Sequence, residues 1–477
     1  MKRFSRFYII SQVLALAGYA DAQTPVTSAI QFTVGSFAPS AGPEVPAELG
    51  TLTVPKNRHR GSTGTISIPV VRFVATDAAS LKTAPIIYLS GGSGSGVAAF
   101  RGSRFAFFQS LRALGDVVTF DLRGAGTSLP AVNCPEAGTF DVSSPSTLQS
   151  ASSSLRDKAR VCAATLSAAG VDLQGHNIGE IVEDIEALRI GLGAPKIRLI
   201  GISTGSQIAL EYMRRHGNRT ERVVLAGVQG PDQQLHSPVD QEIVVRELSR
   251  RLVASGQATA DFVPAMKSVF DSLEARPRVV LVPQRGKPDS LRVGLGKFDA
   301  QVVVSATLGD RSLMKLLPTI IGAAAKGDFV PLASLKAGVA RSGISAFELL
   351  SDCQTGATPA RLRALTEESK TALLGPATLD FPDACPGWGV KELDPTYRAP
   401  VRSKLPVLIV SGTIDGRTPL RNAAEVKSLL PNATQVIIDG ASHGDDLFLS
   451  TPELGAAITA FLRGEKVHAT RLTLSSL

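Results

Sequence analysis

The hydrophobic positions of the chain form short apolar runs that alternate with segments of helical spacing. Three of the runs are strand-like: PIIYL at residues 85–89, DVVTF at 116–120 and IRLIGI at 197–202. Between the last two, residues 178–192 carry apolar side chains three and four positions apart, as on one face of a helix. Short apolar runs that alternate with helices are typical of a mostly parallel sheet flanked by helices.

The same pattern recurs on both sides of a long helical stretch. The further elements of the sheet pattern are strands at 65–73, 222–228, 406–411 and 434–439, and helices at 105–114, 207–215 and 454–462. The stretch between them is chiefly helical, with helices at 239–254 and 260–275 and an extended pair at 278–282 and 291–296. We therefore expect an α/β domain in two parts, 23–230 and 400–477, and a mainly helical insert at 231–399.

The first 22 residues have the composition of a secretory signal peptide. Lys2, Arg3 and Arg6 precede an apolar run at 7–17, and Ala20-Asp21-Ala22 offers a cleavage site. The apolar run is too short to span a bilayer comfortably, so an amino-terminal anchor is the weaker alternative. We expect export to the periplasm or the extracellular space, with no stable membrane insertion after the signal is removed.

Export would expose four cysteines to an oxidising compartment. They form two couples that are close in sequence, Cys134 with Cys162 and Cys353 with Cys385. Three connectivities are possible, and the local pairing is expected because short loops are the easiest to close. Free buried thiols are the alternative.

Gly201-Ile202-Ser203-Thr204-Gly205 is a G-x-S-x-G motif between an apolar run and a helical segment. A nucleophile elbow requires this strand–turn–helix context, in which the serine hydroxyl is exposed above the end of the strand. The motif predicts Ser203 as a catalytic nucleophile.

A nucleophilic serine needs a base and an acid, which in this arrangement follow it in the chain as acid and then histidine. His443, in GASHG after the strand at 434–439, is the predicted base, with His236 as its competitor. Asp415, in GTIDGRTP after the strand at 406–411, is the predicted acid, although an aspartate before glycine can also serve only a turn. Backbone N–H groups of Thr204 and of Gly92, in the loop SGGSGSG, are the expected oxyanion donors, and any N–H from Gly91 to Gly94 could replace that of Gly92.

Five features occur in order: SGGSG at 90–94, DLRGAGTS at 121–128, GISTGS at 201–206, GTIDGRTP at 412–419 and ASHG at 441–444. With them the chain resembles the prolyl-aminopeptidase and tripeptidyl-aminopeptidase branch of the α/β-hydrolases. The resemblance implies an α/β-hydrolase fold with a large helical cap inserted between the sixth and seventh core strands. It also implies a serine peptidase that removes residues or short peptides from the amino terminus of oligopeptides. It covers about residues 50–230 and 385–465, and Cys353 with CPGW at 385–388 resembles elements of the tripeptidyl relatives.

The substrate is less well defined by the resemblance. Thr204 stands where relatives usually carry an aromatic residue, and the oxyanion loop reads GGSG where they often have GGPG. Such aminopeptidases hold the amino terminus of the substrate with cap carboxylates. The candidates here, Asp232 and Glu242 first, are Asp232, Glu242, Glu247, Glu348 and Asp352. Solvated charges on helix faces are the alternative role for most of them.

Composition excludes or disfavours several other classes of protein and of binding partner. Hydrophobic residues make up 44 % and charged residues 19 %, which excludes a disordered chain. The net charge is +8, or +6 after loss of the signal peptide, and this basic excess is thinly spread along the chain. Aromatic residues make up only 5 % of the chain, so the composition does not favour a nucleic-acid partner. No histidine or cysteine cluster has metal-ligand spacing, and we expect no metal and no cofactor. The expected partner is a small-molecule or short-peptide substrate.

Three other functions stay open at this point. The first is a carboxylic-ester hydrolase with the same three residues. The second is an NAD-binding oxidoreductase, because Gly94 to Ala99 fits G-x-G-x-x-A and Asp121 ends the next strand. The third is a non-catalytic binding protein.

Overall fold

The structure, a computed structural model, describes residues 30–59, 64–134, 136–137, 139, 141–342, 344–378 and 382–474. The predicted signal peptide lies outside these residues.

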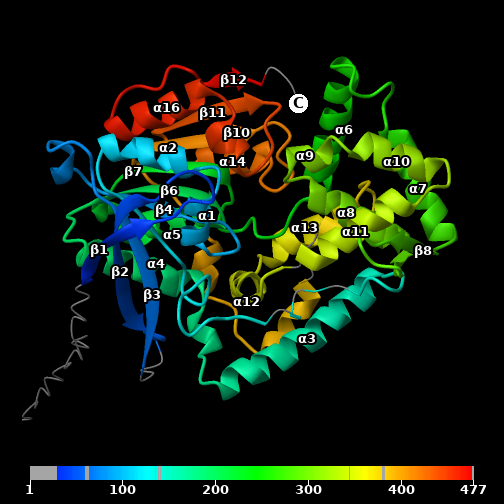
Figure 1. The fold of residues 1–477 in the computed structure, drawn as a ribbon, viewed down its shortest axis with the longest axis horizontal. Coiled ribbons are helices and arrows are strands. Elements are labelled where there is room, and N and C mark those ends of the chain that lie inside the picture. Colours follow the sequence, from blue (N-terminus) through cyan, green and yellow to red (C-terminus); the bar gives the residue numbers. More distant parts are fainter. Residues whose placement is uncertain are drawn as a thin grey trace, which may run out of the picture.

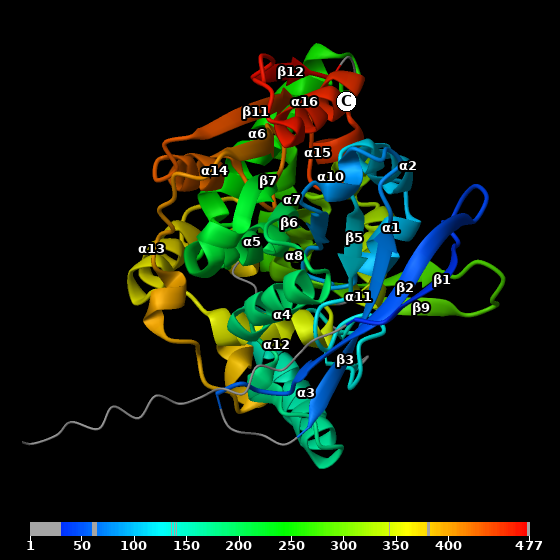
Figure 2. The same cartoon turned by 90° about the vertical axis from the view of Figure 1, so that its left-hand side faces the viewer.

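A sheet of ten strands forms the centre of the larger part of the molecule (Figure 1). Its order is β1-β2-β3-β5-β4-β6-β7-β10-β11-β12. The strands are β1 (Phe32–Phe37), β2 (Val45–Pro55), β3 (Thr65–Phe73), β4 (Ile86–Leu89), β5 (Val117–Phe120), β6 (Ile197–Ser203), β7 (Thr220–Val228), β10 (Val407–Gly412), β11 (Ala433–Asp439) and β12 (Arg471–Thr473). The pairs β1–β2, β2–β3 and β3–β5 are antiparallel, and every pair from β5–β4 to β11–β12 is parallel. In Figure 2 the sheet extends from β12 at the top to β1, β2 and β3 at the lower right.

Helices cover both faces of this sheet, which explains why its central strands are apolar throughout. Along β4, Ile87 and Leu89 face a core shared with α4 (Ile178–Gly191) and α5 (Thr204–His216). Ile86 and Tyr88 face the opposite core, which contains side chains of three short helices and α16. These helices are α1 (Gly96–Arg101), α2 (Phe105–Ser110), α15 (Asp446–Leu449) and α16 (Pro452–Arg463).

The insert between β7 and β10 forms a second body with its own core, at the right of Figure 1. Its elements are α6 (Pro238–Ala254), α7 (Val263–Ala275), β8 (Arg278–Pro283), β9 (Ser290–Leu295), α8 (Lys297–Thr307), α9 (Arg311–Met314), α10 (Leu317–Ala325), α11 (Val330–Ser342), α12 (Ala346–Thr355) and α13 (Pro359–Ser369). Counted from β2, the insert follows the sixth core strand and precedes the seventh. The predicted fold class, an α/β-hydrolase sheet with a helical cap, is confirmed.

One helix of the first part belongs with the cap. The helix α3 (Leu148–Ala168) lies under the cap helices in Figure 1, and the pattern analysis does not identify it. Its buried face is made mostly of small residues, including Ala151, Ala159 and Cys162. The Arg156 side chain donates a 2.8 Å hydrogen bond to the backbone oxygen of Asp383. The floor of the cap is therefore supplied by a segment about 230 residues away in the chain.

Two disulfides confirm the predicted local pairing. Cys134–Cys162 joins the chain after β5 to α3, and Cys353–Cys385 joins α12 to a 3-10 helix, η6 (Pro382–Trp388). The second bond ties α12 to the segment that packs on α3.

Among the described residues, no helix combines the length and the apolar character that a membrane span needs.

Candidate active site

Ser203 stands at the turn between β6 and α5, and its backbone conformation is unusual. Its φ of 55° makes it the one non-glycine residue with positive φ in the described part of the chain. The turn is closed by close backbone contacts: a Cβ atom on Gly201 would overlap the Gly205 backbone, and one on Gly205 would overlap the Leu89 carbonyl oxygen of β4. The two glycines therefore permit a turn that holds Ser203 at the carboxyl end of the sheet.

Asp415 and His443 meet at the same edge of the sheet. Asp415 follows β10, His443 follows β11, and the ring Nδ1 of His443 lies 2.9 Å from Oδ2 of Asp415. Because a carboxylate only accepts, Nδ1 carries the proton of the neutral ring and Nε2 is left as an acceptor. A Cβ atom on Gly227 would lie 2.9 Å from Cε1 of His443, and Ser203 pairs with the next residue, Val228. The ring thus lies over the end of β7, beside the strand that ends in Ser203.

The carboxylate of Asp415 is completely buried and fully hydrogen bonded. Besides His443, it accepts hydrogen bonds from the Arg417 and Thr418 backbone N–H groups at 2.9 and 2.8 Å and from the Thr418 hydroxyl at 2.7 Å. Burial alone would raise the pKa of Asp415, but His443 and the Thr418 donors together hold that pKa below its usual value. The group is therefore an ionised acceptor suited to orienting an imidazole.

The histidine loop is also fixed from outside. Arg104 forms a 2.6 Å ion pair with Asp445, and Asp446 accepts a 2.8 Å hydrogen bond from the Ser442 backbone N–H. Both aspartates therefore fix the loop that carries His443, and the ring Nδ1 lies near Asp415 and, at 3.2 Å, the Thr418 hydroxyl.

The glycine-rich loop after β4 lies against Ser203. A Cβ atom on Gly91 would stand 3.2 Å from the Cβ and 3.8 Å from the Oγ of Ser203. Thr204 is the first residue of α5, so its N–H has no partner within the helix and points out of the helix end. The backbone on both sides of Ser203 can thus donate to an oxyanion, and the positive end of α5 favours negative charge at this point.

A cap helix covers this glycine-rich loop. A Cβ atom on Gly94 would lie 2.8 Å from the Phe347 ring, and one on Gly92 would overlap the carboxylate of Glu348. Both residues belong to the first turn of α12, where the Ser345 hydroxyl accepts a 3.0 Å hydrogen bond from the Glu348 N–H. The structure therefore brings one cap carboxylate, Glu348, directly onto the backbone beside Ser203.

The other four candidate cap carboxylates bind groups of the cap itself. Asp232 accepts two hydrogen bonds from Thr358, at 2.7 and 2.6 Å. Glu242 accepts from the Leu373 backbone N–H at 2.8 Å and pairs with Arg246. Glu247 pairs with Arg250 and Arg251, and Asp352 accepts a 2.5 Å hydrogen bond from Gln234.

Glu348 was thus one of five candidates from the sequence, and Asp232 and Glu242 were named before it. The Ser345–Glu348 capping spacing marks the start of a helix, but only the packing of that helix on Gly92 and Gly94 distinguishes Glu348 from the rest.

The features that suggested a dinucleotide site contact each other. Oδ1 of Asp121 accepts hydrogen bonds from the Ser95 hydroxyl and the Val97 N–H, both at 3.0 Å. Its Oδ2 accepts from the N–H and hydroxyl of Thr127 at 2.8 and 3.0 Å. A carboxylate that is 1 % exposed and bound by four donors of its own chain is not placed to bind a ribose.

Comparison with known proteins agrees with this architecture. Residues 84–265 match the family model described as alpha/beta hydrolase fold, and residues 371–472 match the one described as TAP-like protein. A proline iminopeptidase of Xylella fastidiosa is 29 % identical over 144 residues, which cover 30 % of this chain and 32 % of the relative. The serine protease Hip1 of Mycobacterium tuberculosis is 27 % identical over 206 residues, or 41 % of this chain and 38 % of the relative. The chain thus spans about a third of the length of these curated relatives.

Solved structures are similar to the chain at lower identity. A thermophilic esterase from Thermogutta terrifontis is 15 % identical, with 87 % of this chain and 98 % of the esterase covered and a TM-score of 0.37. An esterase from Exiguobacterium antarcticum is 14 % identical, with 84 % and 97 % covered and a TM-score of 0.37.

The fold is assigned from the strand order, the insertion point of the cap and the two family matches, which agree with one another. The chain has the α/β-hydrolase fold, with an alpha/beta hydrolase domain and a TAP-like carboxyl-terminal domain.

Proposed function

We propose that this hydrolase is a serine peptidase that removes residues or short peptides from the free amino terminus of oligopeptides. The observation that carries the proposal is the carboxylate of Glu348 against Gly92, beside the nucleophile candidate Ser203. Two of the curated relatives, a proline iminopeptidase and a serine protease, support a peptide substrate.

The reaction is acyl transfer. Ser203 Oγ attacks the scissile carbonyl, His443 Nε2 takes the hydroxyl proton, and buried Asp415 stabilises the imidazolium. The proton then passes to the leaving amine, and water releases the acyl group by the same steps. The N–H groups of Thr204 and Gly92 donate to the oxyanion.

The position of Glu348 selects among substrates. A negative charge beside the oxyanion site opposes the reaction of a neutral acyl group, because the developing oxyanion would face a carboxylate. A substrate with a protonated amino group near its scissile bond supplies the opposite charge and forms a charge-assisted hydrogen bond with Glu348. Binding energy of this kind favours peptides with a free amino terminus over blocked ones.

The proposal is tested with matched substrates that differ only in the amino group. Aminoacyl and short peptidyl anilides are compared with their N-acetylated forms, in the wild type, in Glu348→Gln and in the control Glu242→Gln. We expect the wild type to prefer the free amines. Glu348→Gln should lower kcat/KM for the free amines by about 10- to 30-fold, the size of a charged hydrogen bond. It should not lower kcat/KM for the acetylated forms, because removal of the charge relieves the repulsion of their oxyanion. The control, a cap carboxylate bound to the Leu373 N–H, should leave both unchanged.

Short acyl esters complete the panel. Activity confined to esters, with none on any anilide, would reject the peptidase and favour a carboxylic-ester hydrolase that uses the same three residues.

We place the reaction outside the cytoplasm, in the periplasm or the extracellular space. The two disulfides support this location, because such bonds persist mainly in oxidising compartments. Amino-terminal sequencing of the protein recovered from its native host should then begin at Gln23, after the predicted cleavage site. A protein that retains residues 1–22 in the cytoplasm would contradict this location.

A further inference from the structure

The motif DLRGAGTS at 121–128 contributes no group to the reaction proposed above, yet it packs against the oxyanion loop. Asp121 and Ser95 form an isolated antiparallel bridge, and the Leu122 N–H donates a 2.8 Å hydrogen bond to the Gly94 carbonyl. The Cβ of Ala125 lies so close to Gly94 that a side chain there would collide with it at 2.5 Å. The two loops therefore share an interface made largely of backbone.

Asp121 is the polar centre of this interface. One carboxylate oxygen holds Ser95 and Val97, which follow the oxyanion loop, and the other holds Thr127 of its own loop. A Cβ atom on Gly126 would overlap the carboxylate, so the loop closes tightly around it. Asp121 thus joins its own loop to the first turn of α1, directly after the oxyanion loop.

The motif loop is in turn fixed to the body of the molecule by Arg123, whose side chain is fully buried. Its guanidinium forms bidentate hydrogen bonds of 2.7 and 2.6 Å with Asp184 of α4 and donates to the carbonyl oxygens of Lys56 and Gly175.

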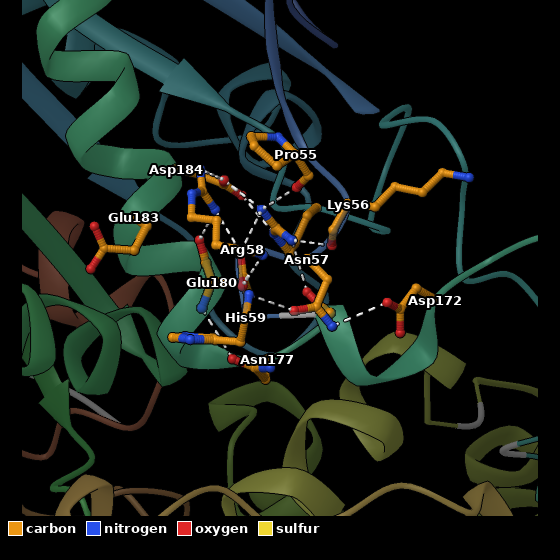
Figure 3. A network of polar contacts seen from close by, with 12 residues as sticks. Pro55, Lys56, Asn57, Arg58, His59, Asp172, Asn177, Glu180, Glu183 and Asp184 are labelled. Atoms are coloured by element: carbon orange, nitrogen blue, oxygen red, sulfur yellow. Dashed lines mark hydrogen bonds and ion pairs between the residues drawn. The ribbon is translucent and has the colours of Figure 1, made fainter. Parts of the chain in front are cut away.

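Figure 3 shows the surroundings of this anchor, where Glu180, Asp184 and Arg58 point toward one another beside Pro55 and Lys56. A rigid helix therefore holds the loop that carries Asp121.

The oxyanion loop has little stiffness of its own. Three of the five residues at 90–94 are glycines, which restrict the backbone less than any other residue. An N–H group stabilises an oxyanion only when it is held at the correct position before the reaction, and a displacement of about 1 Å can cost on the order of 100-fold in rate.

We propose that Asp121 is a positioning residue that fixes the Gly91–Gly94 backbone as oxyanion donor through Ser95 and Val97. The inference rests on the proposed function of Ser203 and its oxyanion donors. Asp121 does not touch the substrate, and Arg123 transmits to it the rigidity of α4.

The test compares Asp121→Ala, Asp121→Asn and Ser95→Ala with the wild type and with the control Asp141→Asn. Asp141 is a suitable control because it is exposed and accepts the same kinds of hydrogen bond, from the N–H and hydroxyl of Ser143. Active sites are titrated with a fluorophosphonate, so that kcat is given per reactive serine. Esters and anilides are both used as substrates.

We expect Asp121→Ala to lower kcat per site about 100-fold, with KM within about threefold. Asp121→Asn should lower it about tenfold, because an amide can accept on only one of the two sides. Ser95→Ala, which removes one donor, should lower kcat about threefold to fivefold. The pH dependence of kcat per site should keep its wild-type shape in all of them.

A second measurement does not depend on catalysis. Hydrogen exchange of the peptide that covers residues 91–97 should become faster in both Asp121 variants and unchanged in Asp141→Asn. A kcat per site within threefold of the wild type in Asp121→Ala, or unchanged exchange over 91–97 in both variants, would overturn the inference. Should Asp121→Ala fail to fold, Asp121→Asn and Ser95→Ala decide by the same two readouts. A wild type without activity on any substrate would reject the proposed function, and the exchange result would still decide the placement of the loop.

Discussion

The core and the cap use their acidic side chains differently. In the core, Asp121, Asp184 and Asp415 are each at most 1 % exposed and bind groups on other loops or helices. In the cap, Glu242 and Glu247 pair with arginines one helical turn away, on the same helix. Glu348 differs from these two because it lies against a loop of the core.

This difference in the use of carboxylates suggests that the core and the cap have different functions. Buried hydrogen-bonded carboxylates hold loops rigidly, since leaving any of their donors without a partner costs about 1–3 kcal/mol. Surface pairs along a helix contribute only about 0.3–0.5 kcal/mol, so the cap can vary without disturbing the core. We infer that the core sets the chemistry and that α12, through Glu348, sets which substrate is accepted.

The largest expected effect is on the nucleophile. Ser203→Ala should lower turnover of every substrate by about 10⁵-fold or more and abolish fluorophosphonate labelling, because the hydroxyl that forms the acyl enzyme is removed. The thermal midpoint should stay the same, since the side chain is only partly buried. Labelling that persists in this variant would disprove the assignment.

The acid should matter next. Asp415→Asn should lower kcat by about 10³- to 10⁴-fold at neutral pH, because an amide allows the wrong tautomer of His443. Asp446→Asn is the control, since Asp446 holds the Ser442 backbone in the same loop without touching the ring. Equal losses in the two variants would show that the loop, and not the carboxylate at Nδ1, is what matters.

The two disulfides compare α3, which supports the cap from the core side, with α12, which carries Glu348. They close loops of similar length, with sequence separations of 28 and 32, so removing either should cost about 3–4 kcal/mol of the free energy of unfolding. Only Cys353→Ala with Cys385→Ala should also raise KM, because that bond ties α12, which carries Glu348, to η6. Urea unfolding and steady-state kinetics measure the two effects. A similar rise in KM on loss of Cys134–Cys162 would contradict the division of tasks.

The smallest effect concerns pH and the core. Burial, and then the charge of Arg123, lower the pKa of His176 to about 4 from its ordinary 6.5. The folded protein therefore binds fewer protons than the unfolded chain between these values, and the free energy of unfolding rises with pH across that range. His176 makes its full contribution to the free energy of unfolding above about pH 6.5, and this contribution is lost as the pH falls to 4.

His176→Gln should remove roughly 2–3 kcal/mol of the difference in unfolding free energy between pH 7 and pH 4.5. Its amide can still donate to the Asp172 carbonyl, which the ring Nδ1 contacts at 2.9 Å. An unchanged pH dependence in the variant would show that other groups carry the acid sensitivity.

The core was predictable because its signals are local. The alternation of apolar runs and helical spacing follows from burial on two faces of a sheet, and it located β4, β5, β6, β7, β10 and β11 within a few residues. The helix α3 was missed because its buried face consists mostly of alanine, serine and cysteine, which give a weak hydrophobic signal.

The candidate site also contains residues that the sequence predicts and one that only the tertiary packing selects. Ser203 ends a strand, and Asp415 and His443 follow strands, in the parallel part of one sheet, so topology brings all three to the same edge. Topology does not select Glu348 over Asp232 or Glu242, because that choice depends on how α12 packs on Gly92 and Gly94.

The sequence by itself determined the sheet, the place of the insert, the local cysteine pairs and the order of the chemical groups. Each of these depends on spacing, turn chemistry or loop length within a few tens of residues. Only the tertiary structure decided that α3 carries the cap, that Asp121 closes on the oxyanion loop and that Glu348 faces Ser203's neighbours. These contacts join segments separated by up to about 260 residues, and side-chain packing selects them among many combinations that the same local pattern allows.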